Sequence, residues 1–191
     1  MPILGIMASQ ISGKLWQPDG AYDSLATVTV PSGGLASVTF AGIPQTYKHL
    51  QIRGIAKNGT TAGDTTTILA QFNGDTTYTN YFGRHLLYGD GSTAAAAANN
   101  SSGFTGGAAG SIASQSTSNI FAASIIDILD YSNTSKNKTV RTLAGFDYNG
   151  SGGINFISSL WINTSAITSI TLKPFVDTFA QYSQFSLYGV K

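Results

Sequence analysis

The chain lacks cysteine and glutamate and is poor in charge. All nine acidic residues among its 191 are aspartate. Without cysteine it can form neither a disulfide nor a thiolate metal site, and a cysteine nucleophile is excluded. Charged residues make up 10% of the sequence, against about 25% in ordinary soluble domains. Because glutamate, lysine, arginine and glutamine usually cover the exposed faces of helices, their scarcity argues against a helical protein.

The charge pattern also excludes some partners. The formal net charge is +1, and no run of basic residues is present. Binding to a nucleic-acid backbone draws on clustered lysine and arginine, so we expect no nucleic-acid partner. Residues 1–12 are apolar but shorter than the roughly 20 residues that span a bilayer. They also lack the positive region that begins a signal peptide. We therefore expect no membrane segment and no export by a leader of this chain.

The residues that are present favour strands. Hydrophobic residues make up 42% of the chain, which is enough to bury a core. Threonine, isoleucine, valine, tyrosine and phenylalanine are common, and they suit a pleated surface. The clearest strand is 47–56, where Leu50, Ile52 and Gly54 alternate with polar residues. A period of two is typical of a strand with one buried face.

Similar patterns along the chain predict roughly eight to ten strands joined by glycine-rich turns. The expected strands are residues 25–30, 35–40, 47–56, 67–72, 78–88, 120–129, 139–146, 154–161, 166–172 and 184–190. The turn at 31–34 gives the best hairpin signal. No helical pattern alternates with the strands, so a parallel α/β sheet is not expected. We predict one all-β domain, an antiparallel, jelly-roll-like β-sandwich.

Two segments fall outside this strand pattern. Residues 1–20 form an extended, apolar N-terminal arm, and residues 21–191 form the sandwich. Glycine, serine, alanine, asparagine and threonine dominate residues 91–118, which predicts a long low-complexity loop within the sandwich. The arm packs either on its own domain or on a neighbouring subunit; burial on a neighbour gains apolar contact and is our assembly prediction. The candidate assembly residues are Ile3, Leu4, Ile6, Met7, Ile11 and Trp16.

No catalytic constellation is visible in the sequence. His49 and His85 lie in predicted strands without a ligand-spaced partner, which favours surface or hydrogen-bonded histidines over metal ligands. Asp127 and Asp130 are three residues apart, so on a strand they point to opposite faces and form a poor acid/base pair. We predict no catalytic residue, no cofactor, no metal site and no enzyme activity.

Two ligand-binding alternatives remain open. Asp75 and Asp90 lie in predicted loops near Asn73 and offer oxygen ligands for calcium, although turn formation is the simpler interpretation. Aromatic side chains can stack on a sugar, but most must fill the core. The candidates for a sugar-binding platform are Tyr78, Tyr81, Tyr88 and Trp161.

Several segments together carry a family resemblance. They are residues 2–9 (Pro-Ile-Leu-Gly-Ile-Met-Ala-Ser), 43–54, 126–131, Leu160-Trp161 and 185–189. In these segments the chain resembles small all-β virion structural proteins of tailed bacteriophages, found among head-decoration, tail and fibre components. The resemblance implies a β-sandwich that assembles on the particle as a homo-oligomer, with a trimer expected. It brings no catalytic motif.

The expected function is therefore that of a non-enzymatic virion structural protein, in first place a capsid decoration (cement) protein. Its partners would be itself and other virion proteins, such as the major capsid protein or tail proteins. Such a protein is made in the host cytoplasm and reaches the virion without a signal peptide. The alternative is a tail or fibre component that binds a surface glycan. A glycan hydrolase is disfavoured, because such enzymes usually need two placed carboxylates.

Overall fold

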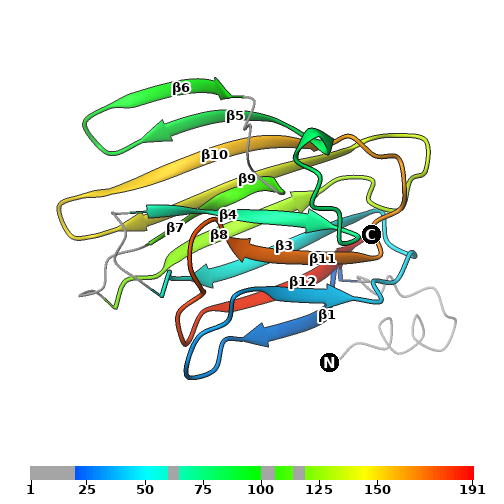
Figure 1. Cartoon of the computed structure of the whole chain (residues 1–191), viewed down its shortest axis with the longest axis horizontal. Helices are drawn as coiled ribbons and strands as arrows, with labels where there is room; N and C mark the ends of the chain where they lie inside the picture. Colours follow the sequence, from blue (N-terminus) through cyan, green and yellow to red (C-terminus); the bar gives the residue numbers. More distant parts are fainter. Residues whose placement is uncertain (1–19, 60–64, 100–105, 114–118) are drawn as a thin grey trace, which may run out of the picture.

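A computed structural model describes residues 20–59, 65–99, 106–113 and 119–191 (Figure 1). Strands make up the regular structure of these ranges, apart from one short 3-10 helix, η1 (Tyr78–Asn80). The strands are β1 (Tyr22–Thr29), β2 (Val38–Ala41), β3 (His49–Ala56), β4 (Thr65–Phe72), β5 (Tyr81–Gly89), β6 (Ala94–Asn99), β7 (Gly107–Ala113), β8 (Ala122–Ile128), β9 (Lys138–Asp147), β10 (Gly152–Trp161), β11 (Ser169–Pro174) and β12 (Gln184–Val190).

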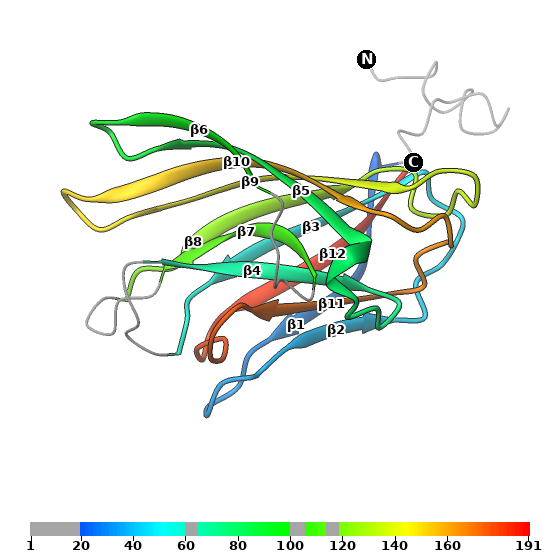
Figure 2. The same ribbon diagram turned by 45° about the horizontal axis from the view of Figure 1, so that its top comes forward.

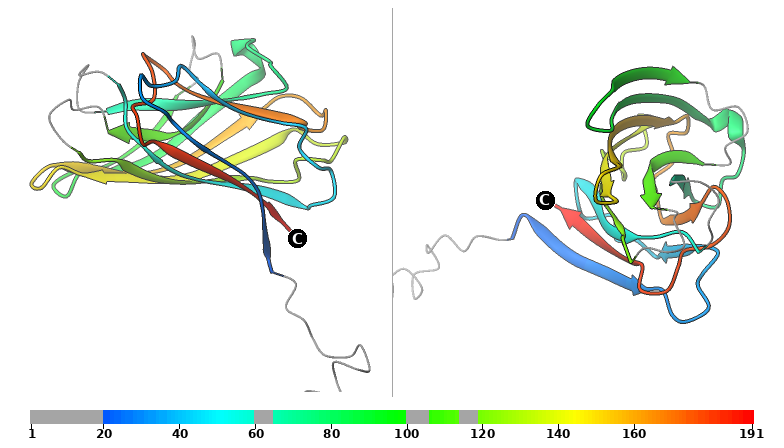
Figure 3. Two further views of the ribbon diagram at one scale, coloured as in Figure 1. Left: turned by 90° about the horizontal axis from the view of Figure 1, so that it is seen from below. Right: turned by 90° about the vertical axis from the view of Figure 1, so that its left-hand side faces the viewer.

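The strands form two packed sheets. The large sheet has eight strands in the order β1-β12-β3-β8-β9-β10-β5-β6, and the small sheet has four in the order β2-β11-β4-β7. Neighbouring strands within each sheet pair antiparallel. The large sheet curves around the small one, as the right-hand view of Figure 3 shows. The prediction of an all-β antiparallel protein with a sandwich-like arrangement is confirmed.

The core lies between the sheets and follows the period-two pattern of the strands. Ile52 of β3 and Ile126 of β8 meet as direct partners in the large sheet, and both are fully buried. Phe72 of β4 and Ile170 of β11 are likewise direct partners in the small sheet, and both are fully buried. The predicted strand at 47–56 is confirmed as β3, and β8 is central, as its apolar sequence indicated. The glycine turn before residue 154 joins β9 and β10 as a hairpin.

The predicted hairpin around residues 31–34 was wrong. β1 pairs with β12 in the large sheet, whereas β2 pairs with β11 in the small sheet. The turn carries the chain from one sheet to the other, with Gly33 and Gly34 at φ 93° and 77°. Leu35 then bridges to Phe179. Turn-forming residues suit either kind of connection, so the local signal could not distinguish a hairpin from a crossing between sheets.

The prediction of a loop across residues 91–118 was also wrong where the structure describes this segment. It contains β6, which pairs with β5, and β7, which pairs with β4. At Gly110 of β7, a Cβ atom would lie 3.2 Å from side-chain atoms of Ala144 and Thr142 on β9. Small residues are therefore needed where β7 lies against the large sheet. In β7 the low-complexity composition reflects close packing, whereas residues 94–97 of β6 are exposed.

Several predicted features lie outside the described residues. These are residues 100–105 and 114–118 and, apart from Gly20, the N-terminal arm. The candidate assembly residues Ile3, Leu4, Ile6, Met7, Ile11 and Trp16 all belong to that arm. Their role stays a prediction.

Candidate assembly surface

A ridge of large apolar side chains crosses the outward face of the large sheet. Ile125, Leu143, Phe156 and Leu87 lie directly opposite one another on β8, β9, β10 and β5. Their exposed fractions are 42%, 46%, 42% and 58%. The small sheet packs on the other face of these strands. The exposure of the four side chains shows that no described residue covers the outward face. We name this row the apolar ridge.

A row of mostly smaller residues runs beside the apolar ridge. On each strand it lies two residues from the ridge, on the side of the β9–β10 turn. From β3 to β5 the row is Ile55, Ala123, Gly145, Ile154 and Gly89, and its two isoleucines are exposed. An open depression of about 690 Å³ extends from Ala123, Gly145 and Ile154 to the β5–β6 and β9–β10 turns, and it continues into a smaller hollow of about 260 Å³. The two depressions share Ala123, Gly145 and Ile154. We name this depression the glycine groove.

Polar residues border the ridge on its other side, and they are paired within the chain. The amide Nε2 of Gln51 donates to Oδ1 of Asp127 at 2.8 Å, and Arg141 donates to Oδ2 at 3.1 Å. Arg53, the direct partner of Ile125 at the β3 end of the ridge row, donates to Gln51, and its guanidinium lies 5.0 Å from the Tyr22 ring centroid and 4.9 Å from that of Tyr188. These contacts hold the charges of this border within one chain.

The apolar ridge and the row beside it are together large enough to form an interaction site. Four positions of the ridge and five of the row beside it, each about 4.8 by 6.8 Å, give an area of roughly 300 Å². Exposed apolar patches of this size on a monomer are often interaction sites. Sequence reasoning missed the patch, although one signal was present: β8, β9 and β10 carry apolar residues on both faces, as in the pairs Ile125-Ile126 and Phe156-Ile157.

The predicted sugar platform was wrong for two of its four residues. Tyr81 and Trp161 are buried, at 5% and 1% exposure. Trp161 donates its indole Nε1 to Asp75, and the Tyr81 hydroxyl donates to the Asp75 carbonyl while accepting from the Phe72 amide. Tyr78 is exposed in η1, and Tyr88 lies at the far end of β5. The four residues do not form one surface, because two of them are needed in the core.

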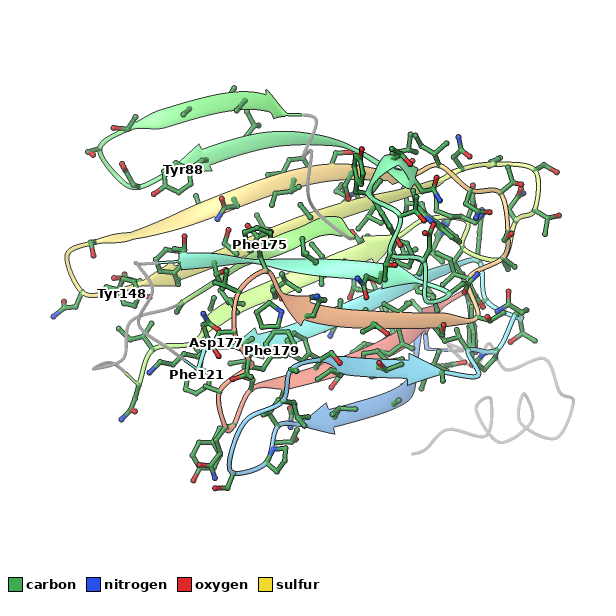
Figure 4. The ribbon with its side chains drawn as sticks, viewed as in Figure 1. Tyr88, Phe121, Tyr148, Phe175, Asp177 and Phe179 are labelled. Atoms are coloured by element: carbon green, nitrogen blue, oxygen red, sulfur yellow. The ribbon has the colours of Figure 1, made fainter. Side chains whose placement is uncertain are left out.

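Tyr88 instead belongs to an aromatic cleft at one end of the sandwich. The cleft has a volume of about 350 Å³, with Phe146 and Tyr148 as its other aromatic residues and Thr65, Asp90 and Ser92 among its polar ones. The Phe146 and Tyr148 rings lie 5.0 Å apart. The β5–β6 and β9–β10 turns project together at this end (Figure 2). Tyr88 lies on β5 and Tyr148 in the β9–β10 turn, and both are labelled in Figure 4. No sequence pattern linked Phe146 and Tyr148 to Tyr88.

His49, Asp75 and Asp90 have local structural roles, whereas the side chain of His85 lies outside the part that the structure describes. His49 Nδ1 accepts the Asp130 amide hydrogen at 2.9 Å. Asp90 accepts the amide hydrogens of Ser92 and Thr93, and these hydrogen bonds hold the pKa of its carboxyl below the usual range. Asp75 likewise accepts the Thr77 amide hydrogen, so turn formation by both aspartates is confirmed. Among the residues that the structure describes, no group of three or more metal-ligating side chains comes together.

Comparison with known protein families, with curated proteins and with solved structures gave no match. Within the described ranges, no helix is long and apolar enough to cross a membrane.

Proposed function

We propose that this chain is a non-enzymatic structural subunit of a tailed-phage particle, a sandwich of jelly-roll type made in the host cytoplasm and assembled into the virion. The observation that carries the proposal is the apolar ridge on the outward face of the large sheet. The β-sandwich is otherwise complete, with its core between the two sheets. An apolar face that the described residues leave uncovered is explained by a further protein that covers it.

Charge supports assembly as the working state. The net charge of +1 gives little electrostatic repulsion between copies, and proteins near zero net charge tend to associate. A homo-oligomer is therefore proposed, with the N-terminal arm as an additional contact and with the trimer that the family resemblance implies. Major capsid or tail proteins are the proposed neighbours in the particle.

The first candidate position is the head, as a decoration protein. A long loop at 91–118 would suit a protein that lies across neighbouring capsid subunits, but β6 and β7 occupy much of this segment. The head position therefore rests on the family resemblance. Copy number separates the two positions: a decoration protein is present in hundreds of copies, and a fibre component is scarce.

The test is to locate the chain in purified particles by quantitative mass spectrometry and antibody labelling. The expected result is a stoichiometric virion component. Leu143→Asp places a charge in the apolar ridge and should reduce incorporation. Tyr182→Asp is the matched control, because Tyr182 is 70% exposed, lies in the loop before β12 and has a positive φ that aspartate tolerates. Absence of the chain from particles would contradict the proposal.

A tail or fibre component that binds a surface glycan is the second candidate. The aromatic cleft favours it, because Tyr88, Phe146 and Tyr148 offer ring faces beside polar side chains. Stacking on such rings is a common way to bind sugars. Tyr148→Ala should then abolish binding of the particle to host cells while leaving incorporation unchanged. Unchanged cell binding would remove this candidate.

A further inference from the structure

The apolar ridge lies on a convex surface, which restricts what can cover it. The large sheet curves around the small one, so its outward face bends away from a flat partner (Figure 3). A second sandwich laid on this face would touch only a few of the strands. A single extended segment can follow the curvature from strand to strand. The shape therefore favours a peptide segment over a second folded domain.

The glycine groove offers such a segment a place for a side chain. Its smaller hollow, of about 260 Å³, lies between Ile125 and Leu143 of the ridge and the smaller Ala123 and Gly145 of the row beside it. These four lining residues are apolar. A cavity of about 150 Å³ already holds a molecule as large as benzene, so the hollow has room for one large aliphatic side chain.

The polar border of the ridge requires no charge from a partner. Asp127 accepts hydrogen bonds from Gln51 and Arg141, and Arg53 donates to Gln51. A segment that covers the ridge should therefore be apolar and uncharged. Residues 2–13 carry no charged side chain. Their large apolar side chains are Ile3, Leu4, Ile6, Met7 and Ile11.

The direction of β1 carries the N-terminal arm away from its own ridge. Thr27 lies at the level of the ridge, because it pairs with Ser186 and Ser186 pairs with Arg53. From Thr27 back to Tyr22, β1 moves about 14 Å toward the end of the sheet that lies opposite the glycine groove. β1 is also an edge strand of the large sheet. A chain that continues in this direction leaves its own body and approaches a neighbour.

We propose that residues 3–9 of one copy lie across the apolar ridge of a neighbouring copy and place a large side chain in its glycine groove. The proposal rests on the proposed function and deepens it, because it identifies what covers the ridge as the N-terminal arm of a second copy. Ile6 is the central residue of the segment, and Leu143 lies on β9, the middle strand of the five from β3 to β5. These two side chains therefore meet in the contact.

The length of the arm fits this placement. Five strands at a spacing of about 4.8 Å are about 24 Å wide. Seven extended residues span about 23 Å, so residues 3–9 cross the whole ridge. Residues 10–19 then remain as a tether that reaches up to about 35 Å. The tether is long enough to lead from the first strand of one body to the outward face of the next.

Three copies can satisfy every arm and every ridge. Each copy gives one arm and accepts one, which is a head-to-tail contact that can close into a ring. The contact covers roughly 300 Å² of the ridge and a similar area of the arm. Release of one copy from the ring breaks two contacts, about 1,200 Å² in total, which is where the range of specific interfaces begins. The arm exchange is therefore compatible with the proposed trimer.

The decisive experiment is disulfide trapping in the full-length chain, which has no cysteine of its own. Ile6→Cys places a thiol in the arm, and Leu143→Cys places one in the ridge. After mild oxidation, the double variant should form covalent species of two and three chains on a non-reducing gel. The two single variants, produced together, should form a mixed disulfide between different chains, which mass spectrometry identifies. Ile6→Cys combined with Tyr182→Cys is the control and should not link.

A charge pair tests the same contact independently. Ile6→Lys and Leu143→Asp each place a charge in the apolar contact, and each should weaken association in sedimentation about tenfold. The double variant should recover much of the loss, because the two opposite charges meet. If association were non-specific, the second charge would weaken it further, which would overturn the proposal. Circular dichroism checks folding, and Tyr182→Asp should leave association unchanged.

Three further outcomes overturn the proposal: a wild-type chain that stays monomeric, disulfides that form only within one chain, and linking no greater than in the control. None of them removes the chain from the virion, where another virion protein would then cover the ridge. Conversely, chains that link in solution but are absent from particles contradict only the proposed function.

Discussion

The indole Nε1 of Trp161 donates a hydrogen bond of 2.9 Å to Oδ2 of Asp75. Trp161 ends β10 of the large sheet, and Asp75 lies in the turn after β4 of the small sheet. The Trp161 ring also packs 5.4 Å from the ring of Phe72. Asn80 donates to the same carboxylate oxygen as Trp161. One carboxylate therefore joins the two sheets at the corner where η1 begins.

Replacing Asp75 with asparagine should destabilise this corner. An amide nitrogen in place of one carboxylate oxygen faces donors from Trp161, Asn80 or Thr77. We expect the free energy of unfolding to fall by roughly 1–3 kcal/mol, the cost of leaving a buried donor unpaired. Chemical denaturation measures the loss. In a double-mutant cycle, Trp161→Phe should account for part of it, and fully additive effects would show that the hydrogen bond contributes nothing.

The pKa of the Asp75 carboxyl predicts that the free energy of unfolding falls at acid pH. Burial raises the pKa of Asp75, but hydrogen bonds from Trp161, Asn80 and Thr77 outweigh burial and hold it below the ordinary value. The folded state therefore binds this proton less readily than the unfolded state does. The resulting stability is complete above the unfolded carboxyl pKa of about 3.9 and is lost as pH falls through the lowered value. Denaturation midpoints at several pH values should fall less steeply at acid pH for Asp75→Asn than for the wild-type chain. An equally steep fall would contradict the role given to Asp75.

Lys138 is a buried ammonium whose loss should be costly. Its side chain is fully buried, and its Nζ donates to the carbonyl oxygens of Asn133, Lys136 and Thr164 at 2.6, 2.7 and 3.0 Å. Burial lowers the pKa of this ammonium. Lys138→Met leaves the carbonyls without their donor, and we expect a loss of roughly 2–4 kcal/mol in the free energy of unfolding.

Lys136→Met is the matched control for that variant. Lys136 lies two residues away and pairs with Asp130 at 2.9 Å, but its side chain is 61% exposed. An exposed pair contributes about 1 kcal/mol or less. Similar losses for the two variants would mean that burial of Lys138 has no special role.

Gly189 should not tolerate a methyl group. A Cβ atom there would overlap Cγ of Tyr47, whose ring lies against β12. Gly189→Ala should cost roughly 1–3 kcal/mol, as overpacking usually does. The loss should shrink in a Tyr47→Ala background, where the ring is gone. At Gly89 of β5 the nearest such contact is an ordinary 3.6 Å, so Gly89→Ala should leave thermal stability nearly unchanged. Equal melting shifts for the two variants would contradict the packing account.

The sequence by itself determined the class of the fold and most of the individual strands. Alternation in β3, the apolar run of β8 and the glycine turn between β9 and β10 are local signals, because the period of two and the turn residues act on neighbours in the chain. The same signals could not reveal β7, whose small residues are explained only by the large sheet against which they pack. The pairing of β1 with β12 was hidden for a related reason, since its partners are far apart in sequence.

Only the tertiary structure decided which aromatic and apolar residues face solvent. Trp161 and Ile125 both lie on strands with large residues on each face, so alternation could not say which face meets the core. The answer depends on where the four-stranded sheet packs. That sheet covers only one face of the eight-stranded sheet. That packing buries Trp161 and leaves Ile125 and Leu143 exposed. The candidate surface is thus a non-local property, because burial depends on residues brought together from distant parts of the chain.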